Sequence, residues 1–162
     1  MNATQANRAK LNPFDNSRMI VLSKDTNPQV RIFFSCNLTH KIFDLNENTA
    51  CWKARNVKND YLDLTVPIYD LDCAFKNENE FYVSTAYHKV TISLIIHNLQ
   101  DKIRLYDVRT KNCKPVIDYE YPHSKHPLNN ILLSQCKNYA YVSDQSGSIA
   151  ILDTRKGNKY CS

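Results

Sequence analysis

The sequence predicts an all-β protein, an incomplete β-propeller of about two to three four-stranded blades. A short aspartate motif recurs three times along the chain, a second shared element precedes each copy, and apolar residues alternate with polar ones between them. Alternation with a period of two is typical of half-buried strands. No stretch combines a helical period of apolar residues with capping residues at both ends, so helices are not expected.

The aspartate motif consists of two apolar residues, an aspartate, one small or apolar residue, and then polar residues. Its three copies are residues 41–46, 104–109 and 150–155. The second element is an aromatic residue, an aromatic or β-branched residue, and a serine. It occupies residues 33–35, 82–84 and 141–143. Two elements repeated in a fixed order argue against coincidence and predict a structural repeat.

The spacing of the aspartates indicates the kind of repeat. Asp107 and Asp153 are 46 residues apart, close to the roughly 40–45 residues of a WD-type propeller blade. Asp44 and Asp107 are 63 residues apart, and removing residues 91–103 restores the short serine-to-aspartate spacing of the other copies. We therefore interpret residues 91–103 as an insert. It is either a gene-model artefact, such as a retained intron, or a real hairpin extension between the second and third strands of the blade.

The repeat also predicts the domain organisation. Residues 1–17 are polar, are interrupted by Pro13 and lack the apolar region of a secretory signal, so we expect a disordered or poorly ordered N-terminus. The partial propeller is expected over residues 18–162, with blades at about 18–57, 66–121 and 128–162. We expect the third blade to stop before its outer strand. Because closed propellers contain four to eight blades, these blades alone do not close a ring.

Composition excludes several classes of function. No apolar run reaches the length of a membrane span, and the six cysteines form no Cys-x-x-Cys pair, so we expect neither a membrane anchor nor a zinc site. With two glycines and no nucleophile, phosphate-loop or dinucleotide motif, we expect no enzyme and no cofactor. A net charge of +5 and a pI near 8.8 favour contact with nucleic acid or an acidic protein surface.

The carboxylates invite a catalytic interpretation, but a structural one is favoured. Asp44, Asp107 and Asp153 recur in step with the blades, and an aspartate at a strand end accepts hydrogen bonds from turn amides. We therefore expect these three to be structural blade aspartates. Asp70 and Asp72 form a pair on one strand, a spacing compatible with acid–base chemistry or a cation. Without a neighbouring nucleophile or histidine, they too are expected to be structural or to lie at an interface.

The best candidate for partner binding is a basic segment. Lys53, Arg55 and Lys58 follow Trp52 and precede Tyr61, a combination suited to contact with phosphates or an acidic peptide. The alternative is an exposed outer strand that carries ordinary basic residues. Trp52 has its own alternative, because a lone tryptophan usually buries its ring, here between two blades.

These segments also carry a resemblance. Residues 52–64 (WKARNVKNDYLDL) and 66–72 (VPIYDLD) resemble the WD repeat-containing protein 74 family of animals and fungi. Shorter matches follow at residues 87–90, 104–107, 141–144 and 151–157. The resemblance covers residues 51–157, and the first segment is far more specific than the aspartate motifs. Two departures stand out: the propeller of the family continues beyond the end of this chain, and residues 91–103 interrupt a block that is continuous in the family.

The resemblance implies a function and partners. Members of the family are assembly factors of the pre-60S particle, the precursor of the large ribosomal subunit, and act in the nucleolus and nucleus through protein and ribosomal RNA contacts. Their release from the particle is linked to an AAA-type ATPase. We therefore expect a scaffold in large-subunit biogenesis and rRNA processing.

Two other functions stay open. The Asp-x-Arg sequences at residues 107–109 and 153–155 resemble the strand ends by which some WD-repeat proteins serve as substrate receptors of cullin-type ubiquitin ligases. The motif is short, and an arginine after a strand is often only solvated. A generic WD-repeat interaction scaffold is the remaining alternative.

Overall fold

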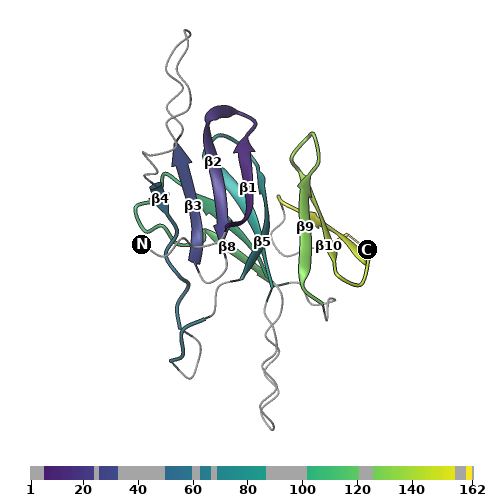
Figure 1. Ribbon diagram of the computed structural model, residues 1–162. Helices are drawn as coiled ribbons and strands as arrows, with labels where there is room; N and C mark the ends of the chain where they lie inside the picture. The colour runs from purple at the N-terminus through teal and green to yellow at the C-terminus, as the bar shows by residue number, and fades with distance from the viewer. Residues whose placement is uncertain are drawn as a thin grey trace.

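The fold is three antiparallel four-stranded sheets that stand side by side (Figure 1). The computed structural model describes residues 6–23, 26–32, 50–59, 63–66, 69–86, 102–120, 126–155 and 160–161. Within these ranges the chain forms twelve strands and no helix. The all-β fold class predicted from the repeat is confirmed, and each sheet has the strand content of one propeller blade.

Each sheet is a meander in which consecutive strands pair. The first sheet contains β1 (Ala6–Asn12), β2 (Asp15–Ser23), β3 (Thr26–Ile32) and β4 (Ala50–Lys53). The second sheet contains β5 (Asp70–Phe75), β6 (Glu80–Thr85), β7 (Lys102–Asp107) and β8 (Ile117–Glu120). The third sheet contains β9 (Leu128–Leu133), β10 (Tyr139–Asp144), β11 (Ile149–Asp153) and β12 (Tyr160–Cys161). The first strand of each sheet lies at its edge, so each sheet can present that strand to a common centre.

The first strands converge. Strand β5 packs against β1 on one side and against β9 on the other, so the second sheet lies between its neighbours (Figure 1). Successive blades of a propeller meet in this way, because the innermost strand of each blade lines the central axis.

The N-terminus differs from the prediction. Residues 1–17 were expected to be disordered or poorly ordered, but residues 6–12 form β1 and residues 15–17 begin β2. Pro13 lies in the turn between these strands, where it costs no ladder hydrogen bond. The side chain of Asn12 stabilises the turn. It accepts a hydrogen bond from the Phe14 amide at 2.9 Å and donates one to the Glu78 carbonyl at 3.0 Å. The first sheet therefore begins at Ala6 and not at residue 18.

Two other boundaries also differ. The third sheet has an outer strand after all, because the two residues of β12 pair with Ile151 and Leu152 of β11. In the second sheet, Lys102 and Ile103 pair with Thr85 and Ser84, so the last two residues of the expected 91–103 insert belong to β7. The rest of that segment lies outside the described residues.

The first and second sheets share an apolar interface. Its buried members are Ile20, Leu22, Ala54, Cys73, Phe81, Val83 and Tyr106. The ring of Trp52 packs edge-on against Phe81 and Tyr106, with ring centroids 5.8 and 5.9 Å away, while Phe81 and Tyr106 stack at 5.5 Å. Aromatic pairs in these geometries add about 0.5–1.5 kcal/mol each to the free energy gained from burial.

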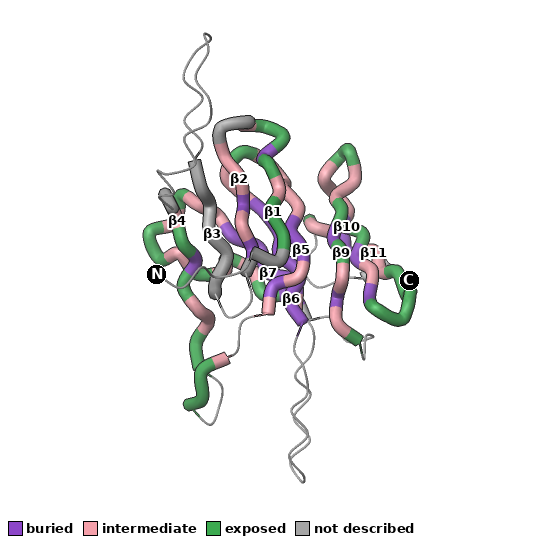
Figure 2. Tube along the Cα trace, viewed as in Figure 1, coloured by how far each residue is buried: buried purple, intermediate pink, exposed green. Residues whose placement is uncertain are grey.

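The second and third sheets share a larger interface. Its buried members are Tyr82, Ile103, Leu105, Tyr119, Leu128, Ile131, Ala140, Val142 and Leu152. Because neighbouring strand residues point to opposite faces, Tyr82 faces the third sheet while Phe81 and Val83 face the first. Figure 2 shows the consequence, since the second sheet is buried along much of β5, β6 and β7.

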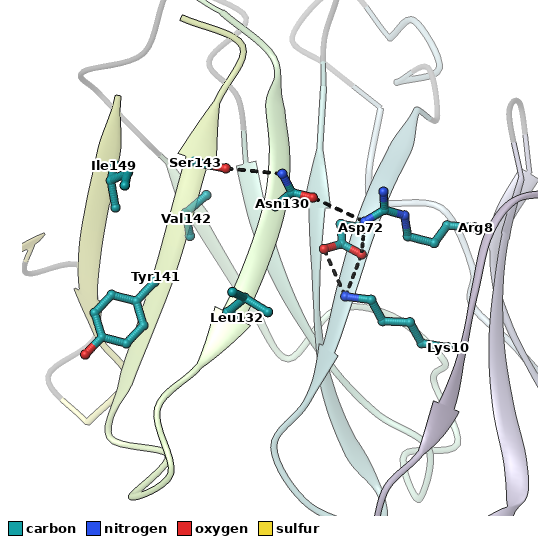
Figure 3. A pocket seen from close by; sticks show the side chains of 9 residues that line it. All are labelled: Arg8, Lys10, Asp72, Asn130, Leu132, Tyr141, Val142, Ser143 and Ile149. Carbon is teal, nitrogen blue, oxygen red and sulfur yellow. Dashed lines mark hydrogen bonds and ion pairs between the residues drawn. The ribbon is translucent and has the colours of Figure 1, made fainter. Parts of the chain in front are cut away.

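A buried carboxylate joins all three sheets. Asp72 on β5 is 1% exposed and forms ion pairs with two cations of β1. Arg8 Nη1 lies 3.0 Å and Lys10 Nζ lies 2.7 Å from Asp72 Oδ1 (Figure 3). Its Oδ2 accepts Lys10 Nζ at 3.0 Å and the backbone amide of Ile131, on β9, at 3.1 Å. Charge-assisted hydrogen bonds of this kind are about twice as strong as neutral ones.

Removing this carboxylate should loosen the sheet contacts. We expect Asp72→Ala to lower the free energy of unfolding by roughly 2–3 kcal/mol, because the buried Ile131 amide loses its acceptor while the partly exposed cations regain water. Urea denaturation followed by circular dichroism measures the change. The control is Glu78→Ala, which removes an exposed carboxylate. Equal losses in the two variants would contradict the role given to Asp72.

A second buried carboxylate, Asp70, differs from Asp72 in its hydrogen bonding and in its pKa. It is fully buried, and among the described residues neither carboxylate oxygen has a hydrogen-bond partner. Desolvation raises the pKa of Asp70 from 3.8 to about 7, although the buried Arg104 guanidinium opposes part of that rise. The folded chain therefore holds a proton at Asp70 that the unfolded chain has already released over most of the range between pH 4 and pH 7.

The pH dependence of stability follows from this difference. As pH rises from about 4 to about 7, Asp70 should lower the free energy of unfolding by up to about 4 kcal/mol, and its contribution should level off above that range. Asp70→Asn should abolish this decline and be more stable than the parent above pH 7. Urea denaturation at a series of pH values tests this pH dependence. Asp63→Asn, a change at an exposed carboxylate, is the control. Parallel pH profiles for parent and Asp70→Asn would refute the assignment.

Candidate partner-binding surface

The basic segment runs from the end of β4 into the loop beyond it. The Trp52 ring packs against the second sheet, and Ala54 is buried beside it. The alternation of the strand therefore turns Lys53 and Arg55 outward, and both are exposed, as is Lys58 further along. The ring of Trp52 thus packs the segment against the second sheet, and the cations lie on the solvent-exposed side of the segment.

A backbone contact brings this segment beside a second basic loop. The Arg55 amide donates to the Cys113 carbonyl at 2.7 Å, which places the segment against the turn between β7 and β8. That turn is fixed by the Thr110 hydroxyl, which donates to the Asp107 carbonyl at 2.8 Å. Lys111 and Lys114 stand exposed on it. We call these five exposed cations the basic surface; its members are Lys53, Arg55, Lys58, Lys111 and Lys114.

The cations of the basic surface form no ion pairs with acids in the part of the chain that the structure describes. Within the described residues, no aspartate or glutamate forms an ion pair with any of its five members, whereas Lys76, Lys102 and Arg104 pair with acids of their own sheet. Exposed ammonium and guanidinium groups that form no ion pair are suited to binding phosphate or carboxylate groups of a partner.

Sequence reasoning found only part of this surface. It identified Lys53, Arg55 and Lys58, but Lys111 and Lys114 lie more than fifty residues away along the chain. Tyr61, predicted to belong to the same site, lies outside the described residues. Trp52 was a candidate for partner contact, yet the structure places its ring against Phe81 and Tyr106.

The blade aspartates close the turns that follow β7 and β11. Asp107 Oδ1 accepts the Arg109 amide at 2.9 Å, and its carboxylate binds the Arg109 guanidinium through Nε at 3.0 Å and Nη2 at 2.8 Å. Asp153 repeats the arrangement with Arg155, at 2.9, 3.1 and 2.9 Å. Hydrogen bonding by Arg109 lowers the pKa of Asp107. These contacts give both aspartates a structural role; Asp44 lies outside the described residues.

One structural aspartate was missed in the sequence. Asp144 ends β10, and its Oδ1 accepts the amides of Ser146 and Ser148, each at 2.9 Å, and the Ser146 hydroxyl at 2.6 Å. Gly147 follows with a φ of +87°, a backbone conformation that favours glycine. The order Asp-x-Ser-Gly-Ser after a strand is the signal that predicts such a turn.

The described part of the chain contains no group of three or more histidine, cysteine, aspartate or glutamate side chains placed to hold a metal ion. It also contains no helix with the length and apolar character needed to cross a membrane.

Comparison with known proteins identifies relatives. No protein-family model matches the chain. WD repeat-containing protein 74 is 32% identical in Bos taurus, 33% in Homo sapiens and 32% in Mus musculus, in each case over 119 residues. The match covers 72% of this chain and 27% of each relative, so the chain spans about a quarter of their length. The chain is therefore related to the WD repeat-containing protein 74 family, which confirms the resemblance noted in its sequence.

Proposed function

We propose that the chain is a WD-repeat scaffold that acts in the biogenesis of the large (60S) ribosomal subunit and in rRNA processing. It works in the nucleolus by contacting proteins and rRNA of the pre-60S particle, and it catalyses no reaction. The similarity to WD repeat-containing protein 74 supports a WD-repeat protein. The observation that carries the proposal is the basic surface, whose five cations have no acidic partner in the described residues.

The chemistry of a pre-ribosomal particle fits this surface. Phosphates bound by lysine or arginine release counterions, and each neutralised phosphate contributes about −0.7 to −0.9 to the slope of log K against log salt concentration. Five contacts would give a slope of about −4. Arg109 and Arg155 are less suited to this role, because each already binds its own aspartate through two nitrogens.

The family resemblance adds a second partner to the proposal. An AAA-type ATPase would act on the bound scaffold to release it from the particle. Such a partner would recognise a surface other than the one occupied by the particle.

A second candidate function has one observation in its favour. The Asp-x-Arg turns after β7 and β11 have the same geometry, and the side chains of Arg109 and Arg155 are exposed on successive sheets. A repeated pair of this kind is compatible with a docking motif for the adaptor of a cullin-type ubiquitin ligase. A generic interaction scaffold would bind neither class of partner.

Replacing the cations separates these functions. With Lys53, Arg55, Lys58, Lys111 and Lys114 all changed to Ala, co-sedimentation with pre-60S material should fall at least ten-fold at about 100 mM salt, and the parent should lose binding steeply as salt rises. The matched control, Arg109→Ala with Arg155→Ala, should sediment like the parent.

Affinity purification of the same proteins identifies their partners by mass spectrometry. Large-subunit proteins and an AAA-type ATPase should accompany the parent and the control. Unchanged co-sedimentation of the five-residue variant would refute the proposal. A cullin adaptor that is lost from the Arg109 and Arg155 variant would support the ligase function instead.

A further inference from the structure

A lysine of the basic surface, Lys58, lies in a short sequence pattern that the proposed function does not use. Residues 57–60 (VKND) place a branched apolar residue before this lysine and an acid two positions after it. Residues 75–78 (FKNE) carry the same pattern around Lys76, with an aromatic residue in the first place. Enzymes that conjugate the small ubiquitin-like modifier (SUMO) to lysines recognise such a segment in an extended conformation. The apolar residue packs against the enzyme, and the acid binds its basic side chains.

The copy of the pattern around Lys76 is held in a closed turn. Residues 76–79 connect β5 to β6, and the Lys76 amide donates to the Glu80 carbonyl at 2.9 Å. The Lys76 ammonium group pairs with Glu80 Oε2 at 3.2 Å, and Phe75 packs against the core between the first and second sheets. A segment fixed in this way extends along an enzyme only if the hairpin opens. We therefore expect Lys76 to be a poor acceptor.

The copy around Lys58 is open. Residues 54–59 continue from β4 without forming a strand or a helix (Figure 2), and Lys58 is exposed. The Val57 amide donates to a side-chain oxygen, Asn56 Oδ1, at 2.8 Å and not to a neighbouring strand. Val57 is partly exposed and belongs to neither of the two apolar cores. The lysine and the apolar residue before it are thus accessible; Asp60 lies outside the described residues.

The exposure of Lys58 is not that of an open sheet face. Its segment runs along the junction of the first and second sheets, because Trp52 packs against Phe81 and the Arg55 amide donates to the Cys113 carbonyl. Both sheets of this junction are present. A four-residue pattern often occurs by chance. Here the contrast in local structure between the two copies distinguishes the lysine that an enzyme can reach.

We propose that Lys58 is an acceptor for covalent attachment of the small ubiquitin-like modifier. The Lys58 amine attacks the carbonyl carbon of the terminal glycine of the modifier, which the conjugating enzyme carries as a thioester. The C–N bond of an isopeptide forms, the C–S bond breaks, and the enzyme thiol leaves. Of the two protons that the ammonium group gives up, one goes to solvent and one to the departing sulfur. An activating enzyme makes the thioester beforehand at the expense of ATP.

Conjugation would control the basic surface, a consequence that rests on the proposed function. The isopeptide removes the positive charge of Lys58. A folded protein attached at this position also occupies the space beside Lys53 and Arg55, which are exposed on the same segment. The modifier and the particle therefore exclude each other from this surface.

Reconstituted conjugation tests the proposal directly. The purified 162-residue chain is incubated with the activating enzyme, the conjugating enzyme, the modifier and ATP, without a ligase. One slower band should appear in denaturing electrophoresis, and mass spectrometry of its peptides should find the glycine remnant of the modifier on Lys58.

The variants separate the acceptor from the pattern around it. Lys58→Arg should abolish the band, because a guanidinium keeps the charge but is not acylated. Asp60→Asn leaves the acceptor in place and should lower the initial rate about ten-fold, because the enzyme loses a charge-assisted hydrogen bond. Lys76→Arg and Glu78→Gln are the matched controls in the second copy and should react like the parent.

Several results would overturn the proposal. These are the absence of a conjugate, a conjugate that persists in Lys58→Arg, or equal initial rates for the parent and Asp60→Asn. Attachment to Lys76 in preference to Lys58 would contradict it as well.

Co-sedimentation of the purified conjugate separates this proposal from the ribosomal one. The conjugate should associate with pre-60S material at least ten-fold less than the parent at about 100 mM salt. Equal association of the two would overturn the control of the basic surface by conjugation. Failure of the unmodified parent to associate would refute the ribosomal proposal, while the band and its loss in Lys58→Arg would still establish the acceptor.

Discussion

Asp72 is buried where the first strands of three sheets meet. It forms ion pairs with two cations of β1 and accepts a hydrogen bond from one backbone amide of β9. Both apolar interfaces depend on this convergence, because sheets that share a centre can press their faces together. The middle sheet consequently buries residues on both of its faces, with Phe81 toward one neighbour and Tyr82 toward the other. A repeat architecture is stabilised by such contacts between adjacent units. The position of the basic surface follows from the same arrangement.

Most of the fold was predictable because its signals are local. The period of two and the repeated aspartate motif lie within single blades, and they predicted the all-β fold class. Strand β1 was not predictable in this way, because Arg8 and Lys10 resemble a polar tail and their counterion, Asp72, lies more than sixty residues away. Strand β12 has only two residues, too few for a pattern.

The candidate site was predictable only in part, for a related reason. A basic run next to Trp52 is visible in the sequence, but its connection to Lys111 and Lys114 is formed in the fold, by the hydrogen bond from Arg55 to Cys113. The blade aspartates are the opposite case, since Asp107 and Asp153 bond to residues two positions away and their role follows from local sequence.

The proposed function requires that two loops distant in the sequence form one surface that faces the pre-60S particle. Chemical crosslinking of the bound chain, read by mass spectrometry, tests it most directly. We expect Lys53, Lys58, Lys111 and Lys114 all to crosslink to components of the particle. Lys76 and Lys102, which pair with acids of their own sheet, should not crosslink. Crosslinks confined to Lys76 and Lys102 would contradict it.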